Sequence, residues 1–515
     1  MALIRTVATL GSYTMVSRVL GFVREILTAD FLGASNISDA FFVALRLPNM
    51  FRSLFAEGAF SVAFVPIFAG KVATDGAVEA KRFAEEALAV LLVALLLFLI
   101  LGEFAAPWIL DVIAPGFRAN PAKFALALDL TRIMFPYLLF LSLVALQGGI
   151  LNSLERFAAA AITPVLLNIF LIATLLGVRP LTGQALAWAV TGAGLAQFLW
   201  LMFSCQRAGM ALSLPVPRLT PELKRLLRIM VPGVFGAGVT QINLLVSTAI
   251  ASLLPVGSVS FLYYADRLNQ LPLAVIGIAI GTAILPGLSR QVRTGDNAAA
   301  NLTQNRGLEL ALLLTLPAAV ALAVAAHPIL KVLFQHGRFS AADAQATAGA
   351  LIAYAAGLPA FVVIKVMAPG FYARHDTRTP VTIGAVAVAI NIALTIGLGL
   401  GTGLAHVGVA MATSIAGWVN ALALTLVLSR RGLFSLDRGA RRRLPRLVLA
   451  AIGTGGVVLV LEYALSGALA GSLALRIAAL ALLVGGGITA FFLLALAFAG
   501  IDRGDLLRRL RRQTA

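Results

Sequence analysis

The sequence predicts an all-α polytopic membrane protein with 14 transmembrane helices. Of its 515 residues, 60% are apolar and only 12% are charged, about half the charged share of a typical soluble domain. The mean hydropathy is +0.96, and apolar runs of about 20 residues, long enough to cross a bilayer, recur along nearly the whole chain. These properties exclude a soluble globular enzyme, a disordered protein and a secreted disulfide scaffold. The single cysteine, Cys205, excludes an intrachain disulfide and a cysteine metal cage.

Breaks at glycines, prolines and charge clusters divide the sequence into spans, which must be helical because an open strand cannot satisfy its backbone in lipid. We expect the first eight spans at 5–32, 37–69, 84–112, 124–151, 158–178, 183–205, 222–254 and 257–289. The remaining six are expected at 307–326, 344–372, 380–401, 404–428, 444–466 and 476–499. The second span is too long for a straight perpendicular helix, so we expect it to tilt or to kink near Pro48.

The basic residues predict how these spans are oriented. An even number of spans leaves both termini on one side, and the segments of that side hold 27 of the 40 Lys and Arg residues. The opposite loops hold only six. Because cytoplasmic loops are enriched in Lys and Arg, we expect both termini in the cytoplasm. The net charge of +18 therefore mostly reflects orientation, and we expect no nucleic-acid partner.

Short motifs recur along the chain at offsets of 216 to 223 residues. Thr163-Pro164 followed by Asn168, for example, reappears as Thr379-Pro380 followed by Asn391. The offset predicts two six-helix lobes of equal orientation, related by a parallel pseudo-two-fold axis along the membrane normal. We therefore expect an N-terminal lobe, a C-terminal lobe, two additional transmembrane helices and a basic cytoplasmic tail, at residues 1–215, 216–435, 436–500 and 501–515 respectively.

Seven basic residues fall inside the predicted spans. They are Arg18, Arg24, Arg46, Arg52, Arg132, Arg267 and Lys365. Each costs about 2.5–3.5 kcal/mol at a helix centre on insertion scales, so residues of this kind are candidates for function. Arg18 and Glu25 lie seven residues apart, as do Asp39 and Arg46, and each pair therefore shares one helical face. Such charges are either structural ion pairs that seal a helix bundle or the lining of a hydrated central cavity.

The excess of guanidinium groups over carboxylates favours the cavity, because an arginine without a counter-charge inside a membrane needs water or an anionic ligand. The planar fork of arginine also binds phosphate oxygens bidentately. The sequence therefore predicts a site for a diphosphate or another polyanionic head group. We expect no cofactor and no metal, since His327, His336, His375 and His406 share no ligand spacing. No G-x-x-x-x-G-K-[ST] run is present, so ATP is not expected as the direct energy source, and ion gradients and the membrane potential stay open.

Four longer stretches are distinctive. They are SRVLGFVRE (Ser17–Glu25), DAFFVALRLPNMFRSLFAEGAFSVAFVP (Asp39–Pro66), YYADRLNQLP (Tyr263–Pro272) and APGFYARHDTRTP (Ala368–Pro380). Together with the layout of 14 spans, they resemble the MurJ family of lipid II flippases, in the MOP exporter superfamily. The resemblance covers essentially the whole chain. It implies two six-helix lobes around a central cavity, and two C-terminal helices that form a hydrophobic groove for the lipid tail.

The resemblance also implies a substrate, a location and a set of site residues. The substrate would be lipid II, an undecaprenyl diphosphate that carries the disaccharide-pentapeptide unit of peptidoglycan, moved from the cytoplasmic to the periplasmic leaflet of the bacterial inner membrane. Alternating access would move it, in the service of cell-wall biogenesis and cell shape, and membrane lipids would be the other partners. The family's cavity arginines fall on Arg18, Arg24, Arg52 and Arg267 within the matching motifs. The expected cavity or gating acids are Glu25, Asp39, Glu57 and Asp266.

Three other functions stay open from the residues alone. Two are sibling exporters of the superfamily, an O-antigen-type lipid-oligosaccharide flippase and a multidrug antiporter. A drug antiporter that exports cations should line its cavity with carboxylates and aromatic side chains, whereas this chain offers arginines. The third is a membrane enzyme acting on a prenyl diphosphate, which would need clustered carboxylates or a histidine beside a nucleophile. Asp39 and Asp266 are isolated in the sequence, so we expect no enzyme.

Overall fold

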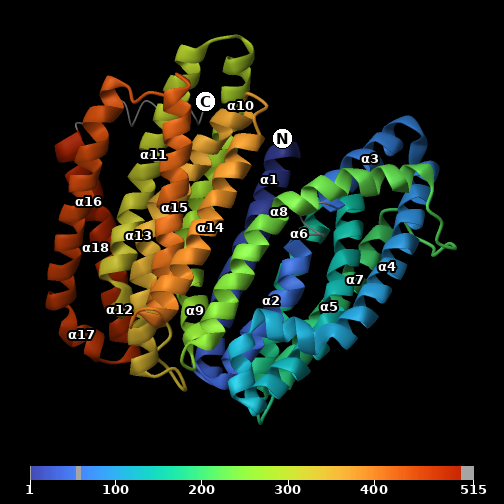
Figure 1. Ribbon diagram of the computed structural model, residues 1–515, viewed down its shortest axis with the longest axis horizontal. Coiled ribbons are helices and arrows are strands. Elements are labelled where there is room, and N and C mark those ends of the chain that lie inside the picture. The colour runs from blue at the N-terminus through green and yellow to red at the C-terminus, as the bar shows by residue number, and fades with distance from the viewer. Residues whose placement is uncertain (1, 54–59, 500–515) are drawn as a thin grey trace. The chain divides into compact units, whose positions relative to one another are not determined.

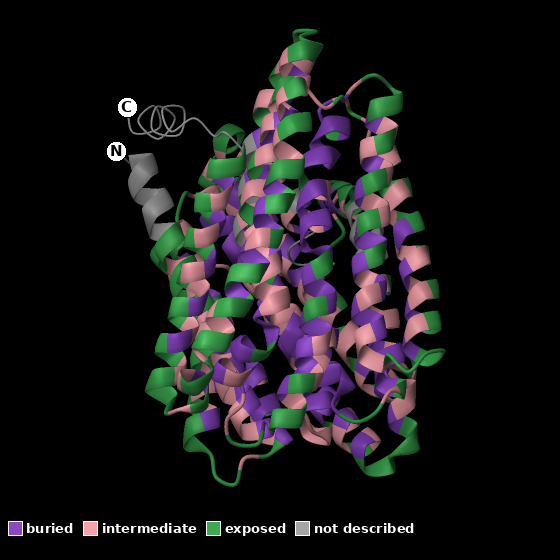
Figure 2. Ribbon diagram, turned by 90° about the vertical axis from the view of Figure 1, so that its left-hand side faces the viewer, coloured by how far each residue is buried: buried purple, intermediate pink, exposed green. Residues whose placement is uncertain are grey.

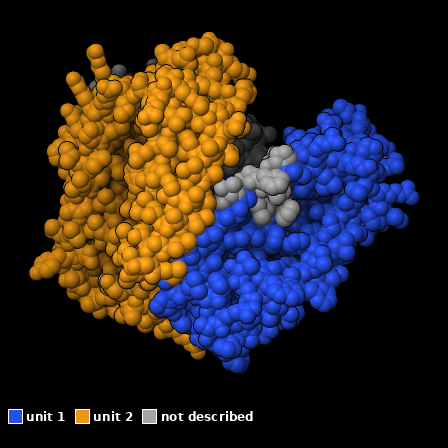
Figure 3. Space-filling view, viewed as in Figure 1, with its two compact units in different colours: residues 1–260 blue, residues 261–515 orange. Residues whose placement is uncertain are grey.

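The computed structural model describes residues 2–53 and 60–499, and within these ranges all of the regular structure is helical (Figure 1). The predicted all-α fold is therefore confirmed. The chain forms two compact units, Met1–Ser260 and Phe261–Ala515 (Figure 3).

The helices up to residue 253 all lie in the first unit. They are α1 (Ala2–Leu32), α2 (Asn36–Phe51), α3 (Ser61–Thr74), α4 (Gly76–Ile113), the short 3-10 helix η2 (Pro115–Ala119), α5 (Pro121–Ser153), α6 (Phe157–Gly177), α7 (Gly183–Arg207) and α8 (Pro221–Leu253). Local sequence explains where several of them begin. Ser35 caps α2 in a capping box with Ser38, and Asn120 followed by Pro121 opens α5.

The remaining helices begin with α9, which starts in the last residues of unit 1. They are α9 (Ser258–Pro272), the π-helix η3 (Leu273–Gly277), α10 (Ile278–Arg293), α11 (Asn297–Val324), α12 (Ala326–Leu333), α13 (Ala341–Tyr372), α14 (Arg378–Leu400), α15 (Ala405–Arg430), α16 (Arg438–Ala464), α17 (Ser466–Ala470) and α18 (Leu473–Ala499).

Ten helices of the described part of the chain are long and apolar enough to cross a membrane. They are α4, α5, α6, α7, α11, α13, α14, α15, α16 and α18. The other four predicted spans overlap α1, α2 with α3, α8, and α9 with α10. The protein is therefore a multi-pass membrane protein, and the count of 14 crossings stays a prediction.

The second predicted span is interrupted, as is the eighth. Helix α2 runs through Pro48 and ends one turn later at Phe51, and wider π-type turns follow at 52–53 and at 60. The residues between them, 54–59, lie outside the described ranges. In the eighth span, α9 ends at Pro272 and the π-helix η3 leads into α10. A proline removes one helical donor, and π-type turns often mark functional sites.

Two pairs of helices at repeat-related positions are buried to the same extent. Figure 2 shows how buried, intermediate and exposed residues are distributed along the helices. The most apolar windows of α5 and α13, the fourth and tenth predicted spans, are both 67% buried. Those of α6 and α14, the fifth and eleventh, are both 17% buried. Helix α5 packs against α2, α4 and α7 in the first unit, and α13 packs against α11 and α15 in the second. Each unit is therefore built around its own central helix.

Two glycines at repeat-related positions allow this packing. A Cβ atom on Gly194 of α7 would lie 2.4 Å from the ring of Tyr137 on α5. A Cβ atom on Gly417 of α15 would lie 3.0 Å from the ring of Phe361 on α13. Small residues let membrane helices approach closely, and here each glycine accepts an aromatic ring from the central helix of its unit.

Helix α8 belongs to the first unit by its contacts, although the repeat places it at the start of the second half. It packs against η2, α3 and α4. The backbone N–H of Gly116 in η2 donates to the hydroxyl of Ser252 at 3.0 Å. A Cβ atom at Gly116 would come within 2.1 Å of the Ser252 carbonyl oxygen, so the two segments are in direct contact. The boundary between the compact units, after Ser260, therefore comes later in the chain than the predicted lobe boundary between 215 and 216. The lobe boundary is based on the sequence repeat and stays a prediction.

The turn between α13 and α14 is held by Asp376, which lies outside the predicted spans. Its carboxylate accepts hydrogen bonds from the backbone N–H of Thr379 at 2.9 Å and from the Thr379 hydroxyl at 2.7 Å. Arg431, at the end of α15, forms an ion pair with it at 2.7 Å. The Thr379 hydrogen bonds, and then Arg431, lower the pKa of Asp376 from 3.8 to about 2.

Replacing Gly194 with Ala should destabilise the protein by about 1–3 kcal/mol, because the added methyl group overpacks the Tyr137 ring. Thermal unfolding of the purified protein in detergent measures this loss. Gly192→Ala on the same helix is the matched control, since a Cβ atom there meets Phe170 at an ordinary 3.5 Å. Equal unfolding temperatures for the two variants would contradict the packing account.

Replacing Asp376 with Asn should cost about 1 kcal/mol at neutral pH, a modest value because Arg431 is half exposed. The carboxylate has a lowered pKa in the folded protein, so its stabilisation is complete above about pH 4 and is lost as the pH falls towards 2. Denaturant unfolding at pH 7, 5, 4 and 3 should therefore show the gap between wild type and variant closing only in the most acidic samples. A gap that is unchanged at pH 3 would refute this role.

Candidate anion-binding site

Helix α1 carries two of the predicted site arginines, and they have different surroundings. Arg18 is exposed, and no described residue forms a hydrogen bond or ion pair with it. Arg24 is largely buried, with 17% of its side chain exposed, and forms an ion pair through Nη2 with the neighbouring Glu25, which is 6% exposed. Its Nη1 donates to Oδ1 of Asn168 on α6 at 2.9 Å. Glu25 therefore pairs with Arg24 and not with Arg18, whose helical face it shares.

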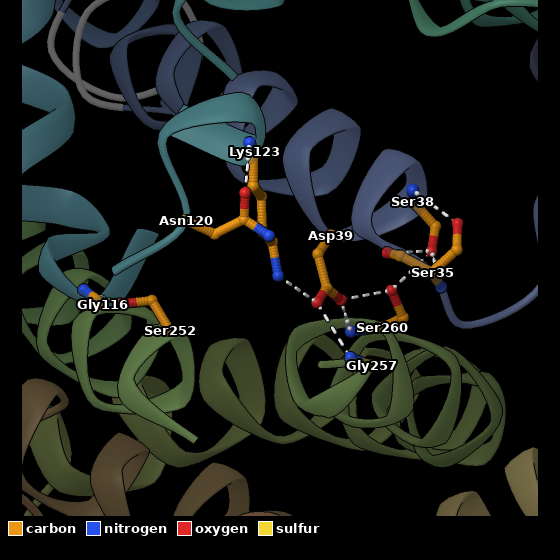
Figure 4. A network of polar contacts seen from close by, with 9 residues as sticks. All are labelled: Ser35, Ser38, Asp39, Gly116, Asn120, Lys123, Ser252, Gly257 and Ser260. Atoms are coloured by element: carbon orange, nitrogen blue, oxygen red, sulfur yellow. Dashed lines mark hydrogen bonds and ion pairs between the residues drawn. The ribbon is translucent and has the colours of Figure 1, made fainter. Parts of the chain in front are cut away.

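Among the predicted site residues that the structure describes, Asp39 is the most deeply buried, at 1% exposure. Its carboxylate forms an ion pair with Lys123 of α5 at 2.8 Å (Figure 4). The backbone N–H groups of Gly257 and Ser260 donate to it at 2.9 and 3.0 Å, and the Ser260 hydroxyl donates at 2.6 Å. Asp39 therefore joins α2, α5 and the start of α9 within unit 1.

Arg46 of α2 and Ser53 in the turn after it contact α8 at a spacing of seven residues. Arg46 donates to the Thr248 hydroxyl and, at 3.5 Å, to the Leu244 carbonyl oxygen. Ser53 accepts from the side-chain amide of Gln241 at 3.1 Å. The face shared by Asp39 and Arg46 thus makes polar contacts with α8 and the turn after it.

The other predicted site residues that the structure describes lie after α2 and on α9. Arg52 is half-buried in the π-type turn after α2, where its backbone N–H bonds to the carbonyls of Asn49 and Pro48. In unit 2, the guanidinium of Arg267 lies over the ring of Tyr263 at 4.7 Å. Asp266 accepts a hydrogen bond from the side-chain amide of Gln270, one turn later on α9. Glu57 lies outside the described residues.

Two residues with these contacts are not among the predicted site residues. The span predicted at 124–151 leaves Lys123 in the loop before it, yet its side chain is buried in the first turn of α5, where its backbone N–H bonds to the side chain of Asn120. The signal for this position is Asn120-Pro121, which begins the helix before residue 123. Asn168 belongs to the predicted repeat, and the signal for its contact with Arg24 is a single side-chain amide in an otherwise apolar span.

The chemistry of these groups is that of anion binding. Among the residues that the structure describes, no group of three or more His, Cys, Asp or Glu side chains is placed to hold a metal ion. The cationic residues predicted for the site are all arginines, and a guanidinium offers forked donors to phosphate oxygens.

The sequence matches the family described as "Lipid II flippase MurJ" over residues 28–479. The probable lipid II flippase MurJ of Rhizobium meliloti (strain 1021) is 44% identical, over 99% of this chain and 97% of its own length. That of Rhizobium tropici is 42% identical, over 100% and 97%. The lipid II flippase MurJ of Burkholderia cenocepacia is 38% identical, over 89% of this chain and 90% of its own.

Solved structures with this fold include a lipid II flippase MurJ in an inward closed conformation. It superposes with a TM-score of 0.78 at 25% identity, and covers 97% of this chain and 99% of its own. An inward-facing multidrug resistance MATE family transporter of the MOP superfamily superposes with a TM-score of 0.67 at 16% identity, over 83% and 98%. The second likeness concerns the fold alone.

Replacing Lys123 with Met should destabilise the protein by about 3–5 kcal/mol, because the buried Asp39 carboxylate loses its counter-charge. The unfolding temperature of the purified protein measures this. Lys81→Met is the matched control, since Lys81 forms an exposed ion pair with Glu85 at 3.6 Å that is worth only about 0.5 kcal/mol. In the Asp39→Asn background the Lys123 substitution should cost much less, and full additivity of the two changes would refute their coupling.

Proposed function

The chain belongs to the MurJ family of lipid II flippases, and we propose from this membership that it moves lipid II from the cytoplasmic to the periplasmic leaflet of the bacterial inner membrane. It is a transporter in this proposal and catalyses no chemical step. Alternating access exposes the binding site first to one side and then to the other. Both termini lie in the cytoplasm, because 27 basic residues fall on that side and six on the other.

In the proposed mechanism the diphosphate of lipid II is held by Arg18, Arg24, Arg52 and Arg267. One observation carries this assignment. Arg18 is an exposed cation on a helix of the predicted membrane region, and no described residue balances its charge. A charge in that position needs water or an anion, and a diphosphate supplies oxygens that match the guanidinium fork.

The acidic residues have different parts in the proposal. Glu25 orients Arg24 through their ion pair and reduces its charge when no substrate is bound. Asp39 anchors the start of α9 to α2 and α5, at the predicted periplasmic end of these helices. Asp266 is a neighbour of Arg267 on α9 and Glu57 belongs to the same motif as Arg52, so both are proposed as gating acids.

The prenyl tail is proposed to stay in the lipid phase along α16 and α18, the two helices beyond the second lobe. These helices pair with each other, and their outer faces carry large exposed apolar side chains. Examples are Ile452 at 64% and Leu482 at 63% exposure. A head group of several charges would then be shielded by protein while the tail needs no protein cavity of its own.

Replacing Arg18, Arg24, Arg52 or Arg267 singly with Ala should reduce lipid II translocation by at least about tenfold, because each change removes a charge-assisted hydrogen bond to the diphosphate. The measurement is flipping of a fluorescent lipid II by the purified protein in liposomes, together with growth of cells depleted of their own flippase. Lys at the same positions should restore only part of the activity, since an ammonium lacks the fork.

Arg293→Ala is the control for a general loss of positive charge. Arg293 is at the end of α10, and its guanidinium bonds to the carbonyl of Ser289 on its own helix. This variant should translocate as the wild type does. If all four site variants fold and flip lipid II at the wild-type rate, the proposed anion site is wrong.

A further inference from the structure

Asn168 is a buried side-chain amide on the apolar helix α6, and it contacts α1 at two points. Its Nδ2 donates to the carbonyl oxygen of Ser17 at 3.0 Å, and its Oδ1 accepts from Nη1 of Arg24 at 2.9 Å. Only 4% of its surface is exposed. A buried amide in a membrane helix is costly unless both ends are satisfied, and here α1 satisfies both.

The three residues of α1 beneath this amide lie on one helical face. Ser17, Gly21 and Arg24 are spaced by four and then three residues, which stacks them on successive turns. A Cβ atom on Gly21 would lie 3.6 Å from Nδ2 of Asn168, so a longer side chain there would displace the amide. Gly21 therefore leaves the space in which Asn168 bridges from the backbone of α1 to the guanidinium.

The two contacts also fix which end of the amide meets Arg24. A backbone carbonyl oxygen only accepts hydrogen bonds, and a guanidinium only donates them. Turning the amide over would place an acceptor against the Ser17 carbonyl and a donor against Arg24. The α1 backbone thus holds the amide oxygen towards the arginine.

We infer that Asn168 is a positioning residue for substrate binding, which holds the Arg24 guanidinium in the orientation that receives the diphosphate of lipid II. The inference rests on the proposed function. As a neutral acceptor, Asn168 orients Arg24 without cancelling its charge. Arg18, Arg24 and Glu25 together carry one net positive charge, which a carboxylate at position 168 would neutralise. The amide therefore combines orientation with retention of charge.

A matched control exists on the neighbouring helix. Gln197 of α7 is also a buried amide, 2% exposed, and its Nε2 donates to the carbonyl oxygen of Thr163 on α6 at 2.7 Å. It braces the same helix as Asn168 through the same kind of contact with a backbone carbonyl. A purely structural effect of losing a buried amide should appear in both variants.

The test is a double-mutant cycle on the affinity of the detergent-purified full chain for undecaprenyl diphosphate. Asn168→Ala should weaken binding by about fivefold, the effect of one hydrogen bond to a charged group. The isosteric Asn168→Asp should weaken binding further, because it adds a negative charge beside Arg24. In the Arg24→Ala background, Asn168→Ala should alter the affinity by less than about twofold. Gln197→Leu should bind as the wild type does.

Each outcome tests either the positioning role of Asn168 or the proposed arginine site. If Asn168→Ala and Arg24→Ala weaken binding by factors that multiply in the double variant, Asn168 does not act through Arg24 and the inference is overturned, while the arginine site stands. If Arg24→Ala binds as tightly as the wild type, the proposed anion site itself fails at this residue. Asn168→Leu also lacks the acceptor and keeps most of the side-chain volume without adding charge, so the cycle is read from it when the Ala variant does not fold.

Discussion

A carboxylate inside an apolar helix bundle is stable only where hydrogen-bond donors or a positive charge surround it. The packing of the first unit must therefore bring such groups to Asp39. Its oxygens receive a lysine ammonium from α5, two backbone N–H groups and a serine hydroxyl. These donors come from two segments, α5 and the start of α9, and both must converge on α2 for the charge to be tolerated. The convergence explains why the start of α9 and the preceding helix α8 belong to the first unit, although the sequence repeat assigns them to the second half.

Several contacts that hold the arginines of the membrane helices are with neutral groups. Arg46 donates to a hydroxyl and a carbonyl oxygen of α8, and the guanidinium of Arg267 lies over the face of an aromatic ring. Arg24 donates to the amide oxygen of Asn168 and also pairs with the carboxylate of Glu25. A neutral acceptor fixes the orientation of a guanidinium and leaves its charge in place, whereas a carboxylate cancels it. The contact with Asn168 therefore orients Arg24 without itself removing charge.

The helical class and most helix positions follow from hydropathy, prolines and capping residues, because these signals are local. The placement of charges does not follow in the same way. Counting charges predicted a cation-lined cavity, but it gave no sign that Asp39 is buried against Lys123, which is 84 residues away in the chain. The contact between Asn168 and Arg24 likewise spans 144 residues. Such pairings depend on the packing of whole helices, and spacing within one helix carries no information about them.

The partners of Asp39 also have a consequence for how the protein is made. Its first charge partner, Lys123, follows 84 residues later, but the backbone donor of Ser260 follows only after 221 residues. At about 5–20 residues per second, the ribosome needs roughly 10–45 s to reach that donor after Asp39 has been synthesised. In the later part of this interval, Lys123 is the partner of the Asp39 carboxylate that has already been synthesised. A newly made first half therefore lacks the three donors of Gly257 and Ser260 until the opening turn of α9 has been made.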